Sequence, residues 1–312
     1  GASTQRVRSE KMWALTLREM GIRVTYCYAE NEPGVRSLCE SGKWNFVLAG
    51  KLRLSLAKEI GAITKRRGLP LVFWLHDNAQ FSPERAAHFR GLEKAATLYF
   101  GADATHKLHP PGVRVLVQGV SLWSDRGEGK RGTYASCDGR GGGVVFVGNR
   151  YSGGAGEKRN NLIDRMGHFG AVSVYGAGWG CEDTAVDGRG QADVYKNADA
   201  IFCVSSTNKR RWITSNRLVD ALASGNRLIV ERFSGIEDIV RAPASYVAFH
   251  THTDAFEAVG KERARAGWFK LLGDDLQGEI NAHVAYNHLS WRKMVGVVLC
   301  EVKDWVQKNK TT

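Results

Sequence analysis

Short apolar runs alternate with amphipathic stretches along nearly the whole chain. The runs are rich in β-branched and aromatic residues, as buried strands are. In the first half the expected strands are residues 22–28, 44–50, 69–77, 97–101 and 113–120. The expected helices between them are residues 5–20, 52–67 and 83–96. This alternation is typical of β–α–β units, which build parallel sheets.

A glycine-rich, charged stretch over residues 124–143 interrupts the pattern, and its composition is that of a linker or loop. Beyond it the alternation restarts, and the chain from about residue 265 onward is expected to be helical. The expected strands of this half are residues 144–149, 171–176, 200–205, 227–231 and 245–249. We therefore expect two α/β domains, residues 1–125 and 144–312, with a linker over 126–143.

The composition is that of a globular protein, with 43% hydrophobic and 24% charged residues in 312. No apolar run approaches the ~20 residues of a membrane-spanning helix, and charged residues interrupt the N-terminus where a signal peptide would be apolar. We expect a cytoplasmic protein. The net charge of +12 favours a polyanionic partner, although a merely basic surface is the plain alternative.

Several common functional motifs are absent. YGAGWG at 175–180 has Cys181 where a dinucleotide-binding fingerprint needs its third glycine. The sequence has no GxxxxGK[ST] and no GxSxG, which argues against a P-loop NTPase and an α/β-hydrolase. The six cysteines form no CxxC pair, and no two aspartates are spaced as DxD. We expect neither a structural metal nor a metal held against a phosphate.

The segment NKRRWITSNRLVDALASGNRLIV at 208–230 predicts a ligand-binding helix start. Thr214 and Ser215 are good caps for a helix over 216–224, which Gly225 would end. Its free backbone N–H groups would lie at the carboxyl edge of the sheet, where they favour a diphosphate. Asp220 lies one turn beyond, in reach of ribose hydroxyls. An ordinary capped helix with a solvated Asp220 is the alternative.

A second candidate element follows the strand VVFVGN at 144–149. Arg150, Lys158 and Arg159 lie in and after a glycine-containing loop. Cations in such a loop could stabilise phosphate charge as a leaving group departs. The alternative is a solvated run of charges.

Residues 144–300 resemble the C-terminal half of GT-B glycosyltransferases, especially the branch similar to the CgeB spore-maturation proteins. The resemblance rests on VVFVGNR, VYGAGW, VYKNADAIFCVS, SNRLVDALASGNRLIV and HLSWRKMV, in that order. The first half is similar more loosely, through LREMGIRVTYCY, WNFVLAG, LPLVFWLHDN and LVQGVSLW. The fold implied is an α/β GT-B architecture of two facing Rossmann-like domains, followed by C-terminal helices.

The resemblance implies a nucleoside diphosphate sugar as donor, with UDP-sugar first, and no further cofactor. It implies a catalytic set of His76 and Asp77 on the acceptor side and Arg150 beside the leaving group. The family commonly has Glu where this chain has the shorter Asp220. The implied donor-binding residues are Gly148, Asn149, Arg150, Lys158, Arg159, Gly176, Thr214, Ser215, Asn216, Arg217 and Asp220.

The kind of acceptor is predicted from the positive charge of the chain. Cations interleaved with aromatic residues suit a phosphate backbone and an extruded base, and bacteriophage enzymes that glycosylate hydroxymethylated pyrimidines in DNA look similar in outline. DNA is therefore the first expected acceptor. A cell-envelope polysaccharide glycosyltransferase and a non-catalytic nucleic-acid-binding protein are the alternatives. The expected DNA-binding residues are Lys51, Arg53, Lys58, Lys65, Arg66, Arg67, Lys209, Arg210, Arg211 and Trp212.

Overall fold

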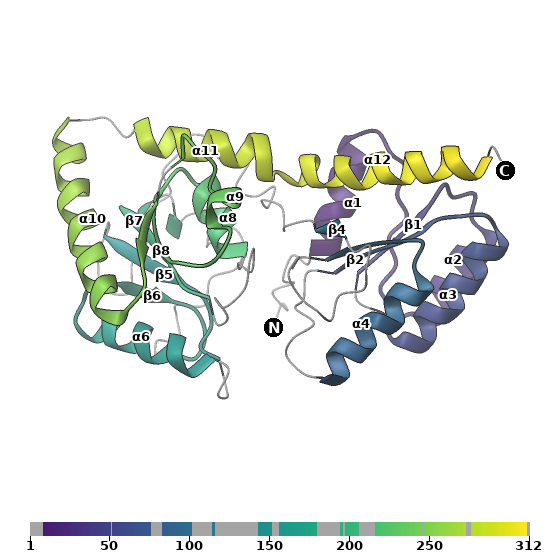
Figure 1. The fold of residues 1–312 in the computed structure, drawn as a ribbon, viewed down its shortest axis with the longest axis horizontal. Helices are drawn as coiled ribbons and strands as arrows, with labels where there is room; N and C mark the ends of the chain where they lie inside the picture. Colours follow the sequence, from purple (N-terminus) through teal and green to yellow (C-terminus); the bar gives the residue numbers. More distant parts are fainter. Residues whose placement is uncertain are drawn as a thin grey trace, which may run out of the picture. The chain divides into compact units, whose positions relative to one another are not determined.

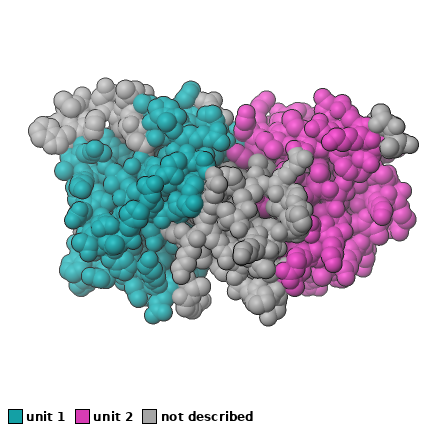
Figure 2. All heavy atoms as spheres, viewed as in Figure 1, with its two compact units in different colours: residues 1–7, 119–290 teal, residues 8–118, 291–312 magenta. Residues whose placement is uncertain are grey.

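The computed structural model has two compact units, which Figure 2 shows in different colours. Unit 1 comprises residues 1–7 and 119–290, and unit 2 comprises residues 8–118 and 291–312. The structure describes residues 9–50, 52–75, 83–101, 114–115, 143–151, 156–179, 194–195, 197–205, 216–244, 246–272 and 276–310.

Unit 2 contains a parallel sheet of four strands in the order β1-β2-β3-β4. Residue Val47 lies opposite Leu71, and Val72 lies opposite Leu98. The strands are β1 (Val47–Ala49), β2 (Leu71–Leu75), β3 (Leu98–Gly101) and β4 (Arg114–Val115). The helices are α1 (Ser9–Glu19), α2 (Glu32–Ser41), α3 (Leu54–Arg66), α4 (Pro83–Ala95) and α12 (Trp291–Lys310).

The alternation of side chains along β2 divides the core of unit 2 into two layers. Leu71 and Phe73 pack with residues of α3 and α4, including Leu56 and Phe89. Trp74 lies on the opposite face. Because both faces are covered, β2 reads as a continuous apolar run, as buried parallel strands do.

Three tryptophans hold the last helix of the chain on unit 2. The ring of Trp74 is stacked on Trp13 of α1 at 5.0 Å and meets Trp291 edge-on at 5.5 Å. Trp13 and Trp291 are each 2% exposed. Helix α12 therefore lies along α1 in unit 2 (Figure 1), whereas its residues were expected in the second domain. Its apolar stripe is buried by tryptophans from the first half of the chain, which local sequence does not reveal.

Unit 1 is a parallel sheet of five strands in the order β6-β5-β7-β8-β9. The strands are β5 (Val144–Val147), β6 (Ser173–Tyr175), β7 (Ala200–Cys203), β8 (Arg227–Glu231) and β9 (Val247–Phe249). The helices are α6 (Glu157–His168), α8 (Asn216–Ala223), α9 (Ile236–Ile239), α10 (His252–Leu272) and α11 (Leu276–Leu289).

Helices cover the sheet of unit 1 on two faces. Phe146 and Phe202 share one cluster with Leu162 of α6 and Ala258 of α10. Helix α8 packs against β7, β8 and α11 (Figure 1). Within the described residues, no helix combines the length and apolarity needed to cross a bilayer.

One expectation for the first half was wrong. Residues 22–28 were expected to form a strand, but they belong to neither sheet of the described residues, in which β1 pairs with β2. The sequence analysis assigned no element to residues 32–41, which form helix α2 and include Pro33 and Gly34. Both residues lie in its first turn, where proline is tolerated, and the Asn31 side chain accepts a hydrogen bond from the Gly34 N–H.

Candidate active site

Two loops at the carboxyl edge of the unit 1 sheet are joined by hydrogen bonds. The N–H of Gly148, after β5, donates to the Tyr175 carbonyl at 2.7 Å. The N–H of Arg150 donates to the Ala177 carbonyl at 2.9 Å, and the Ala177 N–H donates to Asn149 Oδ1 at 3.0 Å. These bonds fix the loop after β5 against the loop after β6. The carboxyl edge is where open parallel sheets bind ligands.

Two glycines leave space at this edge of the sheet. Gly176 has φ +132°, and a Cβ added there would lie 2.5 Å from the Gly148 carbonyl oxygen. A Cβ on Gly148 would overlap the guanidinium of Arg217. Both predicted glycines therefore lie in the site, where they leave room for a second loop and for a cation.

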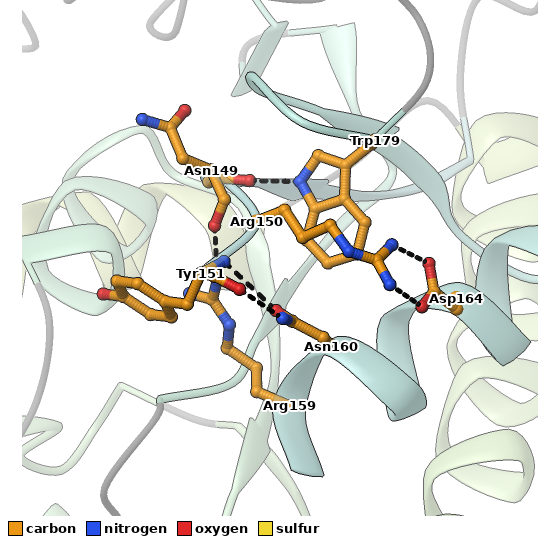
Figure 3. A network of polar contacts seen from close by, with 8 residues as sticks. Asn149, Arg150, Tyr151, Arg159, Asn160, Asp164 and Trp179 are labelled. Atoms are coloured by element: carbon orange, nitrogen blue, oxygen red, sulfur yellow. Dashed lines mark hydrogen bonds and ion pairs between the residues drawn. The ribbon is translucent and has the colours of Figure 1, made fainter. Parts of the chain in front are cut away.

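Arg159 is a buried cation at the start of α6. It is 4% exposed, and its guanidinium lies 3.9 Å from the centre of the Tyr151 ring. One guanidinium nitrogen donates to the Asn149 carbonyl (Figure 3), while the buried Nε has no acceptor among the described residues. Burial, together with the charge of Arg217, lowers the pKa of Arg159 to about 10. Arg159 therefore remains charged at neutral pH.

Arg217 of α8 brings a second guanidinium to the same place. It donates to the carbonyls of Val147 and Val204, the latter at 2.9 Å, and lies 4.6 Å from the Phe146 ring centre. The guanidinium of Arg159 lies 5.6 Å from the same ring. No carboxylate of the described residues pairs with either arginine. Two neighbouring cations held only by carbonyls and aromatic rings favour an anion as their missing partner.

Arg150 is held differently from the sequence expectation. Its guanidinium makes two hydrogen bonds to the Asp164 carboxylate, at 2.6 and 2.7 Å, and lies 5.1 Å from the Trp179 ring centre (Figure 3). Trp179 donates in turn to the Gly148 carbonyl at 2.6 Å. The charge of Arg150 is thus balanced within the protein, so Arg159 and Arg217 replace it as the principal candidate cations.

Lys158 and Asp220 lie at other strand ends of the same sheet edge. The Lys158 ammonium is 3.6 Å from the carboxylate of Glu231, the last residue of β8. Burial raises the pKa of Glu231, and Lys158 opposes this shift. Burial also raises the pKa of the Cys203 thiol at the end of β7, with Arg217 lowering it and Asp220 raising it. The predicted residue Asp220 therefore lies close to the site.

Some predicted residues fall outside the part of the chain that the structure describes. They are His76, Asp77, Lys51, Thr214, Ser215, Lys209, Arg210, Arg211 and Trp212. Helix α8 does begin at Asn216, as the capping pattern predicts, although the Asn216 side chain is not described.

The cations expected to bind DNA are spread over unit 2. Arg53 precedes α3, close to the carboxyl end of β1, and its guanidinium lies 3.6 Å from Glu32. Lys65 and Arg66 end α3, which runs back to the start of β2, so they lie at the opposite edge of the sheet. Exposed Lys58 lies between the two edges.

Arg67 has a structural role that its charge did not suggest. It donates to the carbonyls of Cys39 and Gly42, the latter at 2.6 Å. It therefore joins the end of α3 to the end of α2. Among the expected DNA-binding residues that the structure describes, Arg53 and the pair of Lys65 and Arg66 lie at opposite edges of the unit 2 sheet.

The burial of Arg159 was missed, although the sequence carries a signal for it. Leu162, Ile163 and Met166 form the buried stripe of α6, and Arg159 lies on the same face, three, four and seven positions earlier. An arginine on an apolar stripe is a better candidate for a buried cation than one in the preceding loop. Asp164 and Glu231, which pair with two of the predicted cations, were also missed.

Metal ligation finds no support in the described part of the chain. There, no three His, Cys, Asp or Glu side chains lie together as ligands of an ion.

Comparisons with known proteins relate part of the chain to glycosyltransferases. A family model described as glycosyl transferase-like matches residues 158–284, which begin at α6 and include α8. This match spans less than half of the chain. No curated protein is similar enough in sequence to count as a relative.

Solved structures resemble nearly the whole chain. Anabaena HepE in complex with UDP-glucose has a TM-score of 0.58 at 12% identity, covering 93% of this chain and 88% of HepE. A glycosyltransferase from Rickettsia africae has a TM-score of 0.57 at 12% identity, covering 93% and 86%. The chain has the GT-B fold. This confirms the fold class expected from the sequence.

The fold alone does not select the reaction. A putative UDP-N-acetylglucosamine 2-epimerase from Listeria monocytogenes has a TM-score of 0.52 at 11% identity, covering 94% of this chain and 86% of that protein. Together, the family match and the GT-B neighbours support a glycosyltransferase.

Proposed function

We propose that this protein is a glycosyltransferase that uses a nucleoside diphosphate sugar, with a UDP-sugar as the first donor to test. The family match to residues 158–284 and the GT-B fold support the reaction class. Support for UDP as the nucleotide comes from Anabaena HepE, a structural neighbour whose structure is in complex with UDP-glucose.

The pair of Arg159 and Arg217 carries the proposal. Both guanidiniums lie beside Phe146 at the carboxyl edge of β5, without a described carboxylate. A diphosphate would supply the missing negative charge. It would also accept from the buried Nε of Arg159, which finds no acceptor in the described part of the chain. The same charges would stabilise the diphosphate as it leaves the sugar.

Calorimetric titration with UDP tests this donor site. The variants Arg159→Lys and Arg217→Lys keep a positive charge but lose the planar fork that binds two oxygens at once. Each is expected to weaken UDP binding by roughly 10- to 100-fold, since a hydrogen bond to a charged group contributes about 1.5–3 kcal/mol. Arg165→Lys is the matched control, because Arg165 is exposed on the same helix.

Two results would contradict the donor assignment. One is UDP binding that is unchanged in both variants while thermal melting shows an intact fold. The other is conversion of the UDP-sugar to its epimer, without transfer or hydrolysis, which would make the protein an epimerase.

For the chemical step, we propose that Arg159, Arg217 and the start of α8 stabilise the leaving diphosphate. His76 or Asp77 would position or deprotonate the acceptor hydroxyl. Arg150 would act on the loop through Asp164 and Trp179. We propose that no metal is required, so activity is expected to persist in EDTA. An absolute requirement for magnesium or manganese would refute this part.

For the acceptor, we propose hydroxymethylated pyrimidine in DNA as the first to test. The net charge of +12 and the exposed cations Arg53 and Lys58 support it. Helix α3 has 13 residues, about 20 Å at 1.5 Å per residue. A DNA backbone could therefore meet Arg53, Lys58 and Lys65 only by running along the helix.

A salt titration tests this arrangement. The slope of log affinity against log salt is about −0.9 for each neutralised phosphate. Replacing Lys58, Lys65 and Arg66 by alanine should flatten the slope by about 2 or more, leaving UDP binding unchanged. If no common donor yields labelled DNA, an envelope polysaccharide becomes the first acceptor. If UDP-sugar is also neither bound nor cleaved, a non-catalytic nucleic-acid-binding protein remains.

A further inference from the structure

Arg159 is enclosed too fully for an anion to reach all of its guanidinium directly. The residue is 4% exposed, and its buried Nε has no acceptor among the described residues. A phosphate oxygen must come within about 3 Å of a guanidinium nitrogen to accept a hydrogen bond from it. A group that covers Arg159 must therefore move before a diphosphate binds there.

Two aromatic rings lie beside the guanidinium of Arg159, and they differ in their freedom to move. The ring centre of Tyr151 lies 3.9 Å away, and that of Phe146 lies 5.6 Å away. Phe146 is fully buried in the core of unit 1, whereas Tyr151 is 49% exposed. Burial lowers the pKa of Arg159 and Tyr151 opposes this shift, in agreement with direct contact. The Tyr151 ring can therefore turn into solvent without opening the core.

The backbone of Tyr151 is held in place independently of its ring. The Tyr151 N–H donates to Asn160 Oδ1 at 3.4 Å, and Asn160 Nδ2 donates to the Tyr151 carbonyl at 2.8 Å (Figure 3). Gly156 leaves space for the side chain, since a Cβ added there would lie 2.4 Å from the Cβ of Tyr151. A change of rotamer can thus move the ring while the backbone keeps its hydrogen bonds to Asn160.

We propose that Tyr151 controls access to the donor site: its ring covers Arg159 in the free protein and turns outward when a diphosphate binds. This inference rests on the proposed donor site, because it requires an anion that binds Arg159. In the free protein the cation faces an aromatic ring, which attracts it weakly. A diphosphate replaces that contact with charged hydrogen bonds, which are stronger, so the exchange favours the open form. Uridine carries no phosphate and cannot drive the exchange.

Removal of the ring should change the rate of association. A ligand that binds only to an open form associates more slowly and more weakly by the fraction of protein that is open. Tyr151→Ala should therefore bind UDP about 3- to 10-fold more tightly, the range expected for loss of a competing cation–π contact. The gain should come from faster association, with the dissociation rate nearly unchanged. Tyr151→Phe keeps the ring over the guanidinium and should behave like the unsubstituted protein.

Stopped-flow measurement of tryptophan fluorescence during mixing with UDP gives both rates, and thermal melting checks the fold of each variant. Phe169→Ala is the matched control. Phe169 is an aromatic residue that is 67% exposed and directly follows the other end of α6. Its removal should leave both rates unchanged. Uridine should bind equally to the unsubstituted protein and to Tyr151→Ala.

Fluorine NMR follows the ring itself. Tyr151 is replaced by 3-fluorotyrosine, which keeps the ring and reports its surroundings. Saturating UDP should move the fluorine resonance toward that of a solvent-exposed fluorotyrosine, whereas uridine at the same concentration should not. This measurement removes no aromatic side chain, so it decides the question even if Tyr151→Ala does not fold.

Three results would overturn the proposal. Weaker UDP binding by Tyr151→Ala, through faster dissociation, would make the ring a surface that holds the ligand. Equal association rates in Tyr151→Ala and the unsubstituted protein would show that the ring does not limit access. A fluorine resonance that bound UDP leaves unmoved would show that the ring stays in place. In each case UDP still binds, so the donor site stands. If UDP binds to neither form, the donor site and the role of Tyr151 are both wrong.

Discussion

Two arginines of unit 1 and two of unit 2 are held in different ways in the same fold. In unit 1, Arg159 and Arg217 are held by backbone carbonyls and aromatic rings, and neither forms an ion pair with a described carboxylate. In unit 2, Arg36 pairs with Glu59 and Glu32 at the surface, and Arg53 lies 3.6 Å from the same Glu32. The number of charges does not separate the two pairs of arginines. What separates them is the acid that Arg36 and Arg53 have as a partner, and the burial of Arg159, which is 4% exposed.

This difference separates the two halves of the proposed function. A desolvated cation without an acid interacts strongly with an incoming anion, because little water screens the pair. An exposed cation beside a carboxylate is screened by solvent and salt, and contributes less. The proposal of a donor site in unit 1 therefore rests on the geometry of its cations, whereas the proposal of an acceptor surface on unit 2 rests mainly on net charge.

The largest expected effect concerns a contrast between two glycines with positive φ. Gly176→Ala should destabilise unit 1 by about 3–5 kcal/mol, since strain at φ +132° adds to a clash with the Gly148 backbone. Gly68→Ala in unit 2 should cost about 1 kcal/mol, because φ is +62° and the space around it is open. Urea unfolding of both variants measures the contrast. Equal losses of stability in the two variants would show that the loops of unit 1 shift at little cost to make room for the added Cβ.

The sequence predicted most strands because parallel strands buried on both faces are continuous apolar runs. Val144–Val147 and Leu71–Leu75 are examples. It failed for residues 22–28, whose local preference for a strand is not matched by a paired neighbour in either sheet. Strand formation depends on a partner, which a local pattern does not contain.

The sequence indicated which segments contribute to the candidate site, but not what each side chain does there. The glycines and cations of the loop after β5 were recognised in sequence. Which arginine is balanced depends on Asp164, one helix turn beyond Asn160, and on Trp179 from a different loop. Arg217 reaches the site because it lies in the first turn of α8, beside the ends of β5 and β7. These relations come from tertiary packing.

A smaller effect is expected for Arg67, and it separates a structural cation of unit 2 from those proposed to bind DNA. Arg67→Ala should destabilise unit 2 by about 1–2 kcal/mol, because it removes hydrogen bonds to the Cys39 and Gly42 carbonyls. Lys65→Ala, at an exposed neighbouring position, should change stability by less than about 0.5 kcal/mol. Urea unfolding compares the two. If Arg67→Ala were neutral for stability but weakened DNA binding, Arg67 would belong to the acceptor surface after all.

The smallest expected effect is on the pH dependence of stability. It contrasts the carboxylate of Glu231 in unit 1 with that of Glu59 in unit 2. Burial raises the pKa of Glu231 above its unfolded value, so the folded state holds its proton more tightly. The stabilisation that this proton confers is fully present below the unfolded pKa, about 4.3, and is lost as pH rises through the folded pKa. Lys158, 3.6 Å away, partly offsets the cost of the ionised form.

Glu231→Gln should therefore melt at a higher temperature than the unsubstituted protein at pH 8, and the difference should shrink as pH falls toward 4. Replacing Lys158 by methionine should enlarge the pH dependence of the unsubstituted carboxylate, because the opposing charge is gone. Glu59→Gln is the control, since Glu59 is exposed and its pair with Arg36 lies at the surface. Melting curves at four pH values measure all three. A Glu231→Gln variant less stable at pH 8 would mean that the ion pair with Lys158 outweighs the burial of the carboxylate.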